Sequence, residues 1–385
     1  MKIAIDSRAA IWYRGTGMGT YTYQLLRNLY LVDKKNQYTF LLPNAQFQDL
    51  HPLHSGAFQS ISQTQKTFWE QAVAERIEPA ELEAAGQGPF QIYHIPHNGL
   101  GLPQKPLPTH CKLVVTIHDL IPYTMPETVG PAYLKLFRQE MPEILARADA
   151  VITVSEYSKQ DLLRYTNVDP AKITVIAEGA ESIYHPIPRQ IAQNRLAIRY
   201  DLHQPFFLYL GGFSLRKNLR HILAGFAWLK QQDSAPLQLV VLGRDCPNQQ
   251  LAKEWAKALQ VEDDVKFCGF VPMRELPFFY NACLGFVYPS YYEGFGLPPL
   301  EAMACGAATI ISNVTSLPEV AGDAALQVDP QDPINIGKAM QRLWQQESFR
   351  ITLQQKGLAR AKAFSWTKAA WQTHLLYERL GQDNG

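Results

Sequence analysis

Two glutamates stand eight residues apart in YYEGFGLPPLEAMACG, which spans residues 291–306, and such a pair could bind a ligand rich in hydroxyl groups. Pro298 and Pro299 suit the first turn of a helix, where a proline loses no hydrogen bond, so Glu301 should lie early in a helix. Glu293 then belongs to the preceding loop, EGFG. Both carboxylates can face one ligand and accept hydrogen bonds from its hydroxyls. The alternative for Glu301 is a carboxylate that caps the helix start.

A basic turn in LGGFSLRKNLRHIL, residues 210–223, could bind an anion. Gly212 helps to open the turn, and Asn218 can cap the helix that follows. Arg216 and Lys217 would lie beside the positive end of that helix, where they repel each other unless an anion is present. A diphosphate would neutralise them, with a forked contact from the guanidinium and a point charge from the ammonium. A solvated basic surface turn is the alternative.

A glycine motif, GTGMGTY at residues 15–21, lies between an apolar run near the start and a helix with apolar spacing. Gly17 and Gly19 would let a backbone approach a ligand, and the helix start offers amides to a phosphate. A dinucleotide site would require GxGxxG and a carboxylate at the end of the next strand. This motif is GxGxG, and Asp33 falls in a loop, so we reject an oxidoreductase. A flexible turn without a ligand is the alternative.

A histidine follows an apolar strand in TIHDLIP, residues 116–122. Ligands of open α/β sheets bind at the carboxyl ends of the strands, so His118 is expected to face a cleft. The alternative is a histidine that is satisfied by its neighbour, Asp119.

Short apolar runs alternate with amphipathic stretches, which is typical of parallel sheets covered by helices. The predicted strands are KIAI, YTFLL, QIYHI, KLVVTIH, AVITVS and KITVIA in the first half, and FFLYLGG, LQLVVLG, VKFCG, LGFVYPS, ATIIS and AALQV in the second. The pattern lapses before residue 205, so we place the junction near residues 184–204. We predict one domain over 1–190 and another over 200–365, with helix 366–385 packing back on the first.

Composition narrows the classes of partner. The net charge is +1 with both signs dispersed, which argues against a nucleic-acid-binding protein. Five cysteines without a CxxC spacing argue against a disulfide framework and a zinc site. No leader sequence or apolar run of about 20 residues is found, so we expect a cytoplasmic protein that does not span a membrane. Peripheral contact with the inner face of a membrane stays open.

Together these motifs resemble the retaining glycosyltransferases of family 4. The resemblance rests on EGFGLPPLEAMACG, the RKN turn, the glycine motif and the TIHD strand end, and it extends to VSEYSKQDL, SNVTSLPEVAGDAA and FSWTKAAW. It covers nearly the whole chain. It implies the α/β fold called GT-B, in which two Rossmann-like, doubly wound domains face each other across a cleft. TFWEQ at residues 67–71, IDSR and GMGTYT look most like the bacterial mannosyltransferases and glucosyltransferases of O-antigen and exopolysaccharide assembly.

The resemblance also implies roles for single residues. His118, Glu293, Arg216 and Lys217 would be catalytic: His118 contacts the sugar near the reacting carbon, Glu293 holds the sugar, and the two cations stabilise the diphosphate. Glu301 would hold the ribose hydroxyls. The full donor-binding set is Gly17, Gly19, Gly212, Val271, Gly294, Phe295, Gly296, Leu297 and Glu301.

The chain departs from the family pattern at two places. Many relatives carry an arginine after the first glycine of the second-domain loop, where this chain has Gly212. The common asparagine–glycine turn is replaced by AEGA, and no role is assigned to Glu178.

The expected chemistry is transfer of a hexose from a nucleoside-diphosphate sugar, with retention implied by the family. Negative charge develops on the leaving phosphate, and placed cations can stabilise it. No DxD triplet occurs, so we predict a reaction that needs no metal and no cofactor. GDP-mannose is favoured over UDP-glucose as the donor, and the base would be recognised by backbone around Phe270 and Val271.

The acceptor would be a saccharide or a lipid-linked saccharide, with residues 44–110 as its wall. A sugar-nucleotide epimerase and a non-catalytic sugar-nucleotide binder are the other classes considered. The epimerase would need acid and base groups around the sugar, and the binder would be expected to lack some of the catalytic residues.

Overall fold

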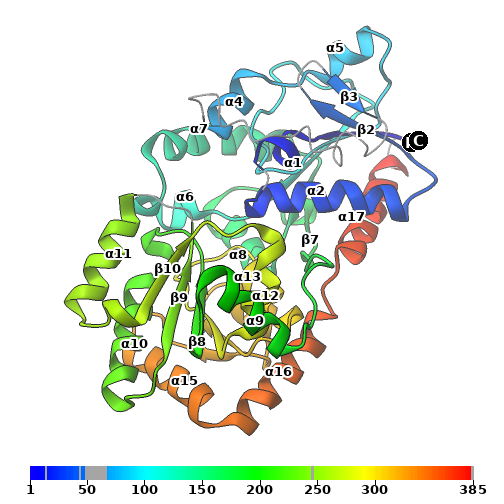
Figure 1. The fold of residues 1–385 in the computed structure, drawn as a ribbon. Coiled ribbons are helices and arrows are strands. Elements are labelled where there is room, and N and C mark those ends of the chain that lie inside the picture. Colours follow the sequence, from blue (N-terminus) through cyan, green and yellow to red (C-terminus); the bar gives the residue numbers. More distant parts are fainter. Residues whose placement is uncertain (14, 43–44, 48–66, 244–246, 383–385) are drawn as a thin grey trace. The chain divides into compact units, whose positions relative to one another are not determined.

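The chain forms two compact units, which a computed structural model describes for residues 1–13, 15–42, 45–47, 67–243 and 247–382 (Figure 1). Unit 1 comprises Met1–Gly179 and Ser365–Gly385, and unit 2 comprises Ala180–Phe364. Each unit has its own sheet and its own hydrophobic core. Both units are of the α/β class.

The sheet of unit 1 has the strand order β3-β2-β1-β4-β5-β6-β7. Its strands are β1 (Lys2–Asp6), β2 (Gln37–Leu42), β3 (Ala45–Phe47), β4 (Ile92–Ile95), β5 (Lys112–Ile117), β6 (Ala150–Thr153) and β7 (Ile173–Val175). All neighbours are parallel except β2 and β3. The apolar runs predicted as strands are confirmed, since strands buried on both faces are continuously apolar. The short antiparallel strand β3 was missed.

Helices connect these strands. Unit 1 contains α1 (Arg8–Trp12), α2 (Gly17–Val32), α4 (Phe68–Ala74), α5 (Pro79–Ala84), α6 (Ile121–Thr124), α7 (Pro131–Arg147), α8 (Glu156–Tyr165) and α17 (Trp366–Gln382), with 3-10 turns η1 (Pro126–Thr128) and η2 (Pro170–Lys172). The last helix of the chain, α17, packs alongside α2 (Figure 1). Two of its side chains reach buried polar partners: His374 Nδ1 lies 2.9 Å from Asp33 Oδ2, and the Tyr377 hydroxyl lies 2.6 Å from Nδ1 of His94.

The sheet of unit 2 has the order β10-β9-β8-β11-β12-β13, and all of its neighbours are parallel. Its strands are β8 (Phe206–Leu210), β9 (Gln238–Leu242), β10 (Val265–Gly269), β11 (Gly285–Tyr288), β12 (Thr309–Ser312) and β13 (Leu326–Val328). This is the Rossmann order, in which the chain returns to the first strand and continues on its other side. The carboxyl ends of β8 and β11 flank that switch point.

The helices of unit 2 are α9 (Arg189–Tyr200), α10 (Leu219–Gln232), α11 (Pro247–Ala258), α12 (Leu276–Ala282), α13 (Leu297–Ala304), α14 (Leu317–Ala321), α15 (Pro333–Gln345) and α16 (Glu347–Ala361), with 3-10 turns η3 (Leu215–Lys217), η4 (Glu262–Asp264) and η5 (Met273–Glu275). Helices α10 and α15 cross closely because Gly225 and Gly337 meet there. A Cβ on Gly337 would lie 2.6 Å from the carbonyl oxygen of Gly225, so no larger residue fits without a shift.

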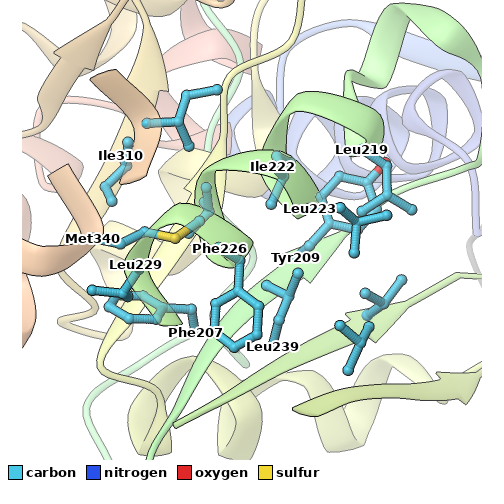
Figure 2. Close-up of a cluster of buried hydrophobic side chains, with 14 of the residues drawn as sticks. Phe207, Tyr209, Leu219, Ile222, Leu223, Phe226, Leu229, Leu239, Ile310 and Met340 are labelled. Carbon is cyan, nitrogen blue, oxygen red and sulfur yellow. The ribbon is translucent and has the colours of Figure 1, made fainter. Parts of the chain in front are cut away.

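The core of unit 2 positions the basic turn. Phe226 and Ile222 of α10 are fully buried against Phe207 and Leu239 of the sheet (Figure 2). Truncating a buried phenylalanine such as Phe226 costs about 3–5 kcal/mol. The start of α10, and with it the turn that precedes it, is therefore fixed relative to β8.

The junction between the units differs from the prediction. It lies at Gly179 and Ala180 rather than near residues 184–204, and unit 1 includes the chain from Ser365 on. Residues 189–200, where no element was predicted, form α9, which packs against α12 of unit 2. The prolines that suggested a linker, Pro186 and Pro188, precede this helix, and Pro188 is its N-cap residue.

Candidate active site

Three charged side chains meet at the switch point of unit 2. Arg216 and Lys217 end the turn η3 after β8, and Glu293 lies in the loop after β11. Oε1 of Glu293 is 3.0 Å from Nη1 of Arg216 and 2.7 Å from Nζ of Lys217. The three side chains are between 11% and 16% exposed, so this is a nearly buried ion-pair cluster.

Glu293 is the anion that the sequence analysis did not foresee. The two cations were expected to repel each other until a diphosphate arrived, but in the structure the carboxylate of Glu293 neutralises them. Burial would raise the pKa of the Glu293 carboxyl, and Arg216 and Lys217 together lower it to about 2. The carboxylate is therefore ionised at neutral pH.

Backbone and aromatic contacts hold the two cations in place. Arg216 Nη1 donates to the carbonyl oxygen of Tyr292 at 2.5 Å, and the amide of Tyr291 donates to the carbonyl of Arg216 at 2.9 Å. Lys217 Nζ donates to the hydroxyl of Tyr288 and lies 4.8 Å from the centre of that ring. These contacts connect the turn after β8 directly to the loop after β11.

Asn218 has another role than the one predicted. It is the N-cap residue of α10, but its side chain makes no cap hydrogen bond. Its amide instead donates to the carbonyl oxygens of Pro289 at 2.9 Å and Pro330 at 2.7 Å. Its left-handed backbone, with φ of 60°, is one that asparagine tolerates better than most residues. Asn218 therefore ties the basic turn to two other loops.

The second glutamate of the pair lies one turn into α13. This helix begins at Leu297 with prolines in its first turn, as predicted, and no acidic residue lies in that turn. The capping alternative for Glu301 is therefore wrong. Its carboxylate accepts hydrogen bonds from the hydroxyls of Tyr280, at 3.3 Å, and Tyr184. Counted over the whole residue, backbone included, Glu293 and Glu301 are each 8% exposed.

Ser316 holds the backbone of the loop EGFG, residues 293–296, in place. The hydroxyl of Ser316 donates to the carbonyl oxygens of Glu293 at 2.9 Å and Phe295 at 2.8 Å. Gly296, the N-cap residue of α13, has φ of 116°, which favours glycine. Gly294, Phe295, Gly296 and Leu297 thus form a rigid approach to the helix start, and their contact with a donor stays a prediction.

His118 follows β5 directly in unit 1 and is 7% exposed. Its amide donates to Oδ1 of Asn98 at 2.8 Å, and Nε2 lies 2.9 Å from the carbonyl oxygen of Pro96. Nδ1 lies 3.4 Å from Oε1 of Glu178. His118 is thus paired with Glu178, a residue that the sequence analysis passed over. Its only signal was the departure of AEGA from the common turn.

The glycine motif near the start lies at the beginning of α2 rather than in a loop. The helix starts at Gly17, and the hydroxyl of its N-cap residue, Thr16, accepts from the amide of Gly19 at 3.2 Å. That amide is therefore used in the cap. Gly17 is exposed, and a Cβ there would meet nothing within 4 Å. A ligand role for these two glycines stays a prediction.

The remaining predicted residues lie at strand ends of unit 2. Gly212 follows β8, is exposed, and accepts a hydrogen bond from the Tyr209 hydroxyl through its carbonyl oxygen at 2.6 Å. Val271 follows β10 and is 7% exposed, whereas its neighbour Phe270 is 66% exposed. The predicted acceptor wall, residues 44–110, lies partly outside the described residues.

Three further observations concern the described residues alone. No group of three or more histidine, cysteine, aspartate or glutamate side chains is arranged to hold a metal ion. Cys111, Cys268, Cys283 and Cys305 are free thiols, and Cys246 lies outside the described part of the chain. None of the helices has the length and apolarity that crossing a membrane requires.

Solved structures define the class of this architecture. Sucrose-phosphate synthase from Thermosynechococcus elongatus superposes with a TM-score of 0.77 at 23% identity, covering 99% of each chain. Anabaena HepE in complex with UDP and glucose gives a TM-score of 0.72 at 14% identity, covering 98% of this chain and all of that one. The fold is accordingly the two-domain α/β fold called GT-B.

Sequence relatives define the family. Residues 15–181 match the model "Glycosyltransferase Family 4", and residues 191–360 match "Glycosyl transferases group 1". O-antigen chain mannosyltransferase B of Escherichia coli is 35% identical over 271 residues, which are 70% of this chain and 71% of that protein. Serotype-specific mannosyltransferase WbdA of Escherichia coli is 32% identical over 275 residues, and the match covers 69% of this chain but 33% of that protein. This chain belongs to family 4 of the glycosyltransferases.

Proposed function

We propose that this glycosyltransferase moves mannose, with retention of configuration and without a metal ion, from GDP-mannose to a saccharide or lipid-linked saccharide. The cluster of Arg216, Lys217 and Glu293 is the observation on which the proposal depends. It joins two cations suited to a diphosphate with a carboxylate suited to sugar hydroxyls. The names of the relatives, both mannosyltransferases, favour mannose.

Arg216 and Lys217 would stabilise the diphosphate leaving group. When the bond to the sugar breaks, negative charge develops on the diphosphate, and fixed positive charges stabilise that transition state. Arg216 and Lys217 are already oriented by Tyr292 and Tyr288, so little reorganisation is needed. The diphosphate would replace one carboxylate oxygen as their partner, and this exchange would free Glu293 to accept hydrogen bonds from the sugar.

The second carboxylate, Glu301, would bind the nucleoside part of the donor. The phenol groups of Tyr280 and Tyr184 orient Glu301 and leave it capacity to accept hydrogen bonds from ribose hydroxyls. The amides at the start of α13, with the positive end of that helix, add attraction for an anion. In unit 1, His118 would contact the donor sugar near the reacting carbon.

UDP-glucose is the second candidate donor, because the structure of HepE, which this fold resembles, contains UDP and glucose. An epimerase or a non-catalytic binder is disfavoured by membership of a glycosyltransferase family. The proposal sets the reaction in the cytoplasm, with peripheral membrane contact if the acceptor is lipid-linked.

The first test is thermal-shift binding with GDP, UDP, ADP, GDP-mannose and UDP-glucose, each with and without EDTA. We expect stabilisation by GDP and GDP-mannose that EDTA does not change. Stabilisation by UDP compounds alone would replace the donor, and loss of the shift in EDTA would contradict metal independence. No shift with any nucleotide at millimolar concentration would overturn the proposal.

The second test is transfer activity of Lys217→Ala. Loss of one charged group that stabilises a transition state lowers kcat by about a hundredfold or more. Lys356→Ala is the matched control, since Lys356 pairs with Asp323 on the exposed surface of the same unit. A folded Lys217→Ala protein with unchanged turnover would exclude Lys217 from the diphosphate site.

A further inference from the structure

Glu178 is a buried carboxyl that none of the predicted motifs uses. It lies in the turn after β7, its side chain is 5% exposed, and Oε1 is 3.4 Å from Nδ1 of His118. Asp119 and Tyr21 interact electrostatically with Glu178. His94 and His97 interact electrostatically with His118. Burying a carboxyl group costs solvation free energy unless the group is hydrogen-bonded or paired. His118 is such a partner for Glu178.

The hydrogen bonds of His118 determine where the proton lies. Nε2 is 2.9 Å from the carbonyl oxygen of Pro96, and a carbonyl can only accept, so Nε2 must carry a hydrogen. Nδ1 and the carboxyl of Glu178 then share one proton, which either group can hold. Burial raises the pKa of the Glu178 carboxyl, although His118 opposes this effect. In both arrangements the pair is neutral and the ring is held at both nitrogens.

Further contacts restrict the imidazole ring of His118 to one orientation. Tyr21 meets it edge-on, with the ring centres 4.6 Å apart and an interplanar angle of 88°. The carbonyl of His118 accepts from the Ser158 hydroxyl at 3.2 Å, and its amide donates to Asn98. The backbone is thus fixed on both sides of the residue, and Glu178 is the group that fixes the ring at Nδ1.

We propose that Glu178 is a positioning residue for His118: by holding Nδ1, while Nε2 donates to the carbonyl oxygen of Pro96, it sets the orientation in which the imidazole ring faces the donor sugar. The inference rests on the proposed function of His118. It gives a role to the glutamate of AEGA, where the chain departs from the common asparagine–glycine turn. Glu178 itself need not touch the sugar.

The activity test is a double-mutant cycle of Glu178→Ala and His118→Ala in the full chain. Misplacing a group that contacts the reacting substrate costs about tenfold to a hundredfold in turnover. We therefore expect that loss from Glu178→Ala, and no further loss when it is added to His118→Ala. Glu178→Gln should retain most of the activity, because its amide can donate to Nδ1. The control is Glu143→Gln, an exposed carboxyl of the same unit.

A spectroscopic test needs no activity. In protein labelled with ¹⁵N-histidine, the His118 signals are those absent from His118→Ala. We expect Nε2 to be protonated in the wild type, and the Nδ1 shift to change in Glu178→Ala but not in Glu143→Gln. Unchanged His118 shifts in Glu178→Ala, or activity losses that multiply in the double variant, would overturn the inference.

The two proposals can fail separately. If the wild type transfers no sugar from any nucleotide sugar, the proposed function fails, and the nitrogen shifts still test the His118–Glu178 pair. If the wild type is active and Glu178→Ala is equally active, only the positioning role fails.

Discussion

Nζ of Lys217 lies 2.7 Å from Oε1 of Glu293, so one salt bridge joins the loops that follow β8 and β11. Arg216 contacts the same oxygen at 3.0 Å. The carboxylate of Glu293 thus occupies the candidate diphosphate site, and under the proposed function a donor would compete with it. We expect this competition to lower the affinity for the donor and to keep the cations in place before the donor binds.

Glu293→Gln should therefore destabilise the free protein and make it more responsive to nucleotide. Breaking a buried ion pair leaves unneutralised charge, which costs roughly 3 kcal/mol in free energy of unfolding. A diphosphate should restore the balance, so we expect GDP to raise the Tm of the variant more than that of the wild type. Asp323→Asn, which breaks an exposed pair in the same unit, should leave both quantities nearly unchanged. An equal or smaller GDP shift in Glu293→Gln would contradict the competition.

Acid should destabilise unit 1 through its buried histidines. Burial lowers the pKa of His94 from 6.5 to about 3 and that of His97 to about 4. Below pH 6.5 the unfolded chain therefore binds protons that the folded chain does not, and stability falls as the pH drops toward these folded values. Each such histidine costs roughly 2 kcal/mol between pH 6.5 and pH 4.5.

The measurement is urea unfolding at pH 7 and pH 4.5 for the wild type and His94→Gln. The variant lacks one of the two groups, so its stability should fall by about 2–3 kcal/mol less over this interval. His203→Gln, an exposed histidine, is the control. The same loss in His94→Gln as in the wild type would show that His94 does not stay neutral.

Glu301→Gln tests the ribose contact. Hydrogen bonds to a charged group contribute about 1.5–3 kcal/mol, so the wild type should bind GDP roughly tenfold to a hundredfold more tightly than 2′,3′-dideoxy-GDP. In Glu301→Gln this difference should largely disappear, as measured by isothermal titration calorimetry. Glu347→Gln, on an exposed helix start, should keep it. Equal discrimination in the wild type and Glu301→Gln would remove the ribose from this site.

Gly296→Ala should destabilise unit 2. The residue has φ of 116°, and an added Cβ would lie 2.6 Å from Cδ2 of Leu317. Backbone in such a region costs of order 1–3 kcal/mol for other residues, so the Tm should fall clearly. Gly212→Ala is the matched glycine control, since a Cβ there meets nothing within 4 Å. Similar Tm values for the two variants would contradict the strain at Gly296.

The sequence by itself determined the strands other than β3, the start of α13 and the family. Continuous apolar runs predicted the parallel strands, and Pro298 and Pro299 predicted the start of α13, because both signals are local. The pair Glu293 and Glu301, with the RKN turn, indicated a glycosyltransferase. The helix α9 was missed because Pro186 and Pro188 precede it and its pattern is weak. The strand β3 has three residues, too few for a period to show.

Only the tertiary structure decided the partners of the charged groups. Glu293 lies far along the chain from Arg216 and Lys217, and they meet because β8 and β11 are neighbours at the switch point. In the same way, His118 meets Glu178 because β5, β6 and β7 are successive parallel neighbours with their carboxyl ends at one edge. A local pattern specifies a strand, but strand pairing specifies which loops meet, and pairing depends on contacts across the whole chain.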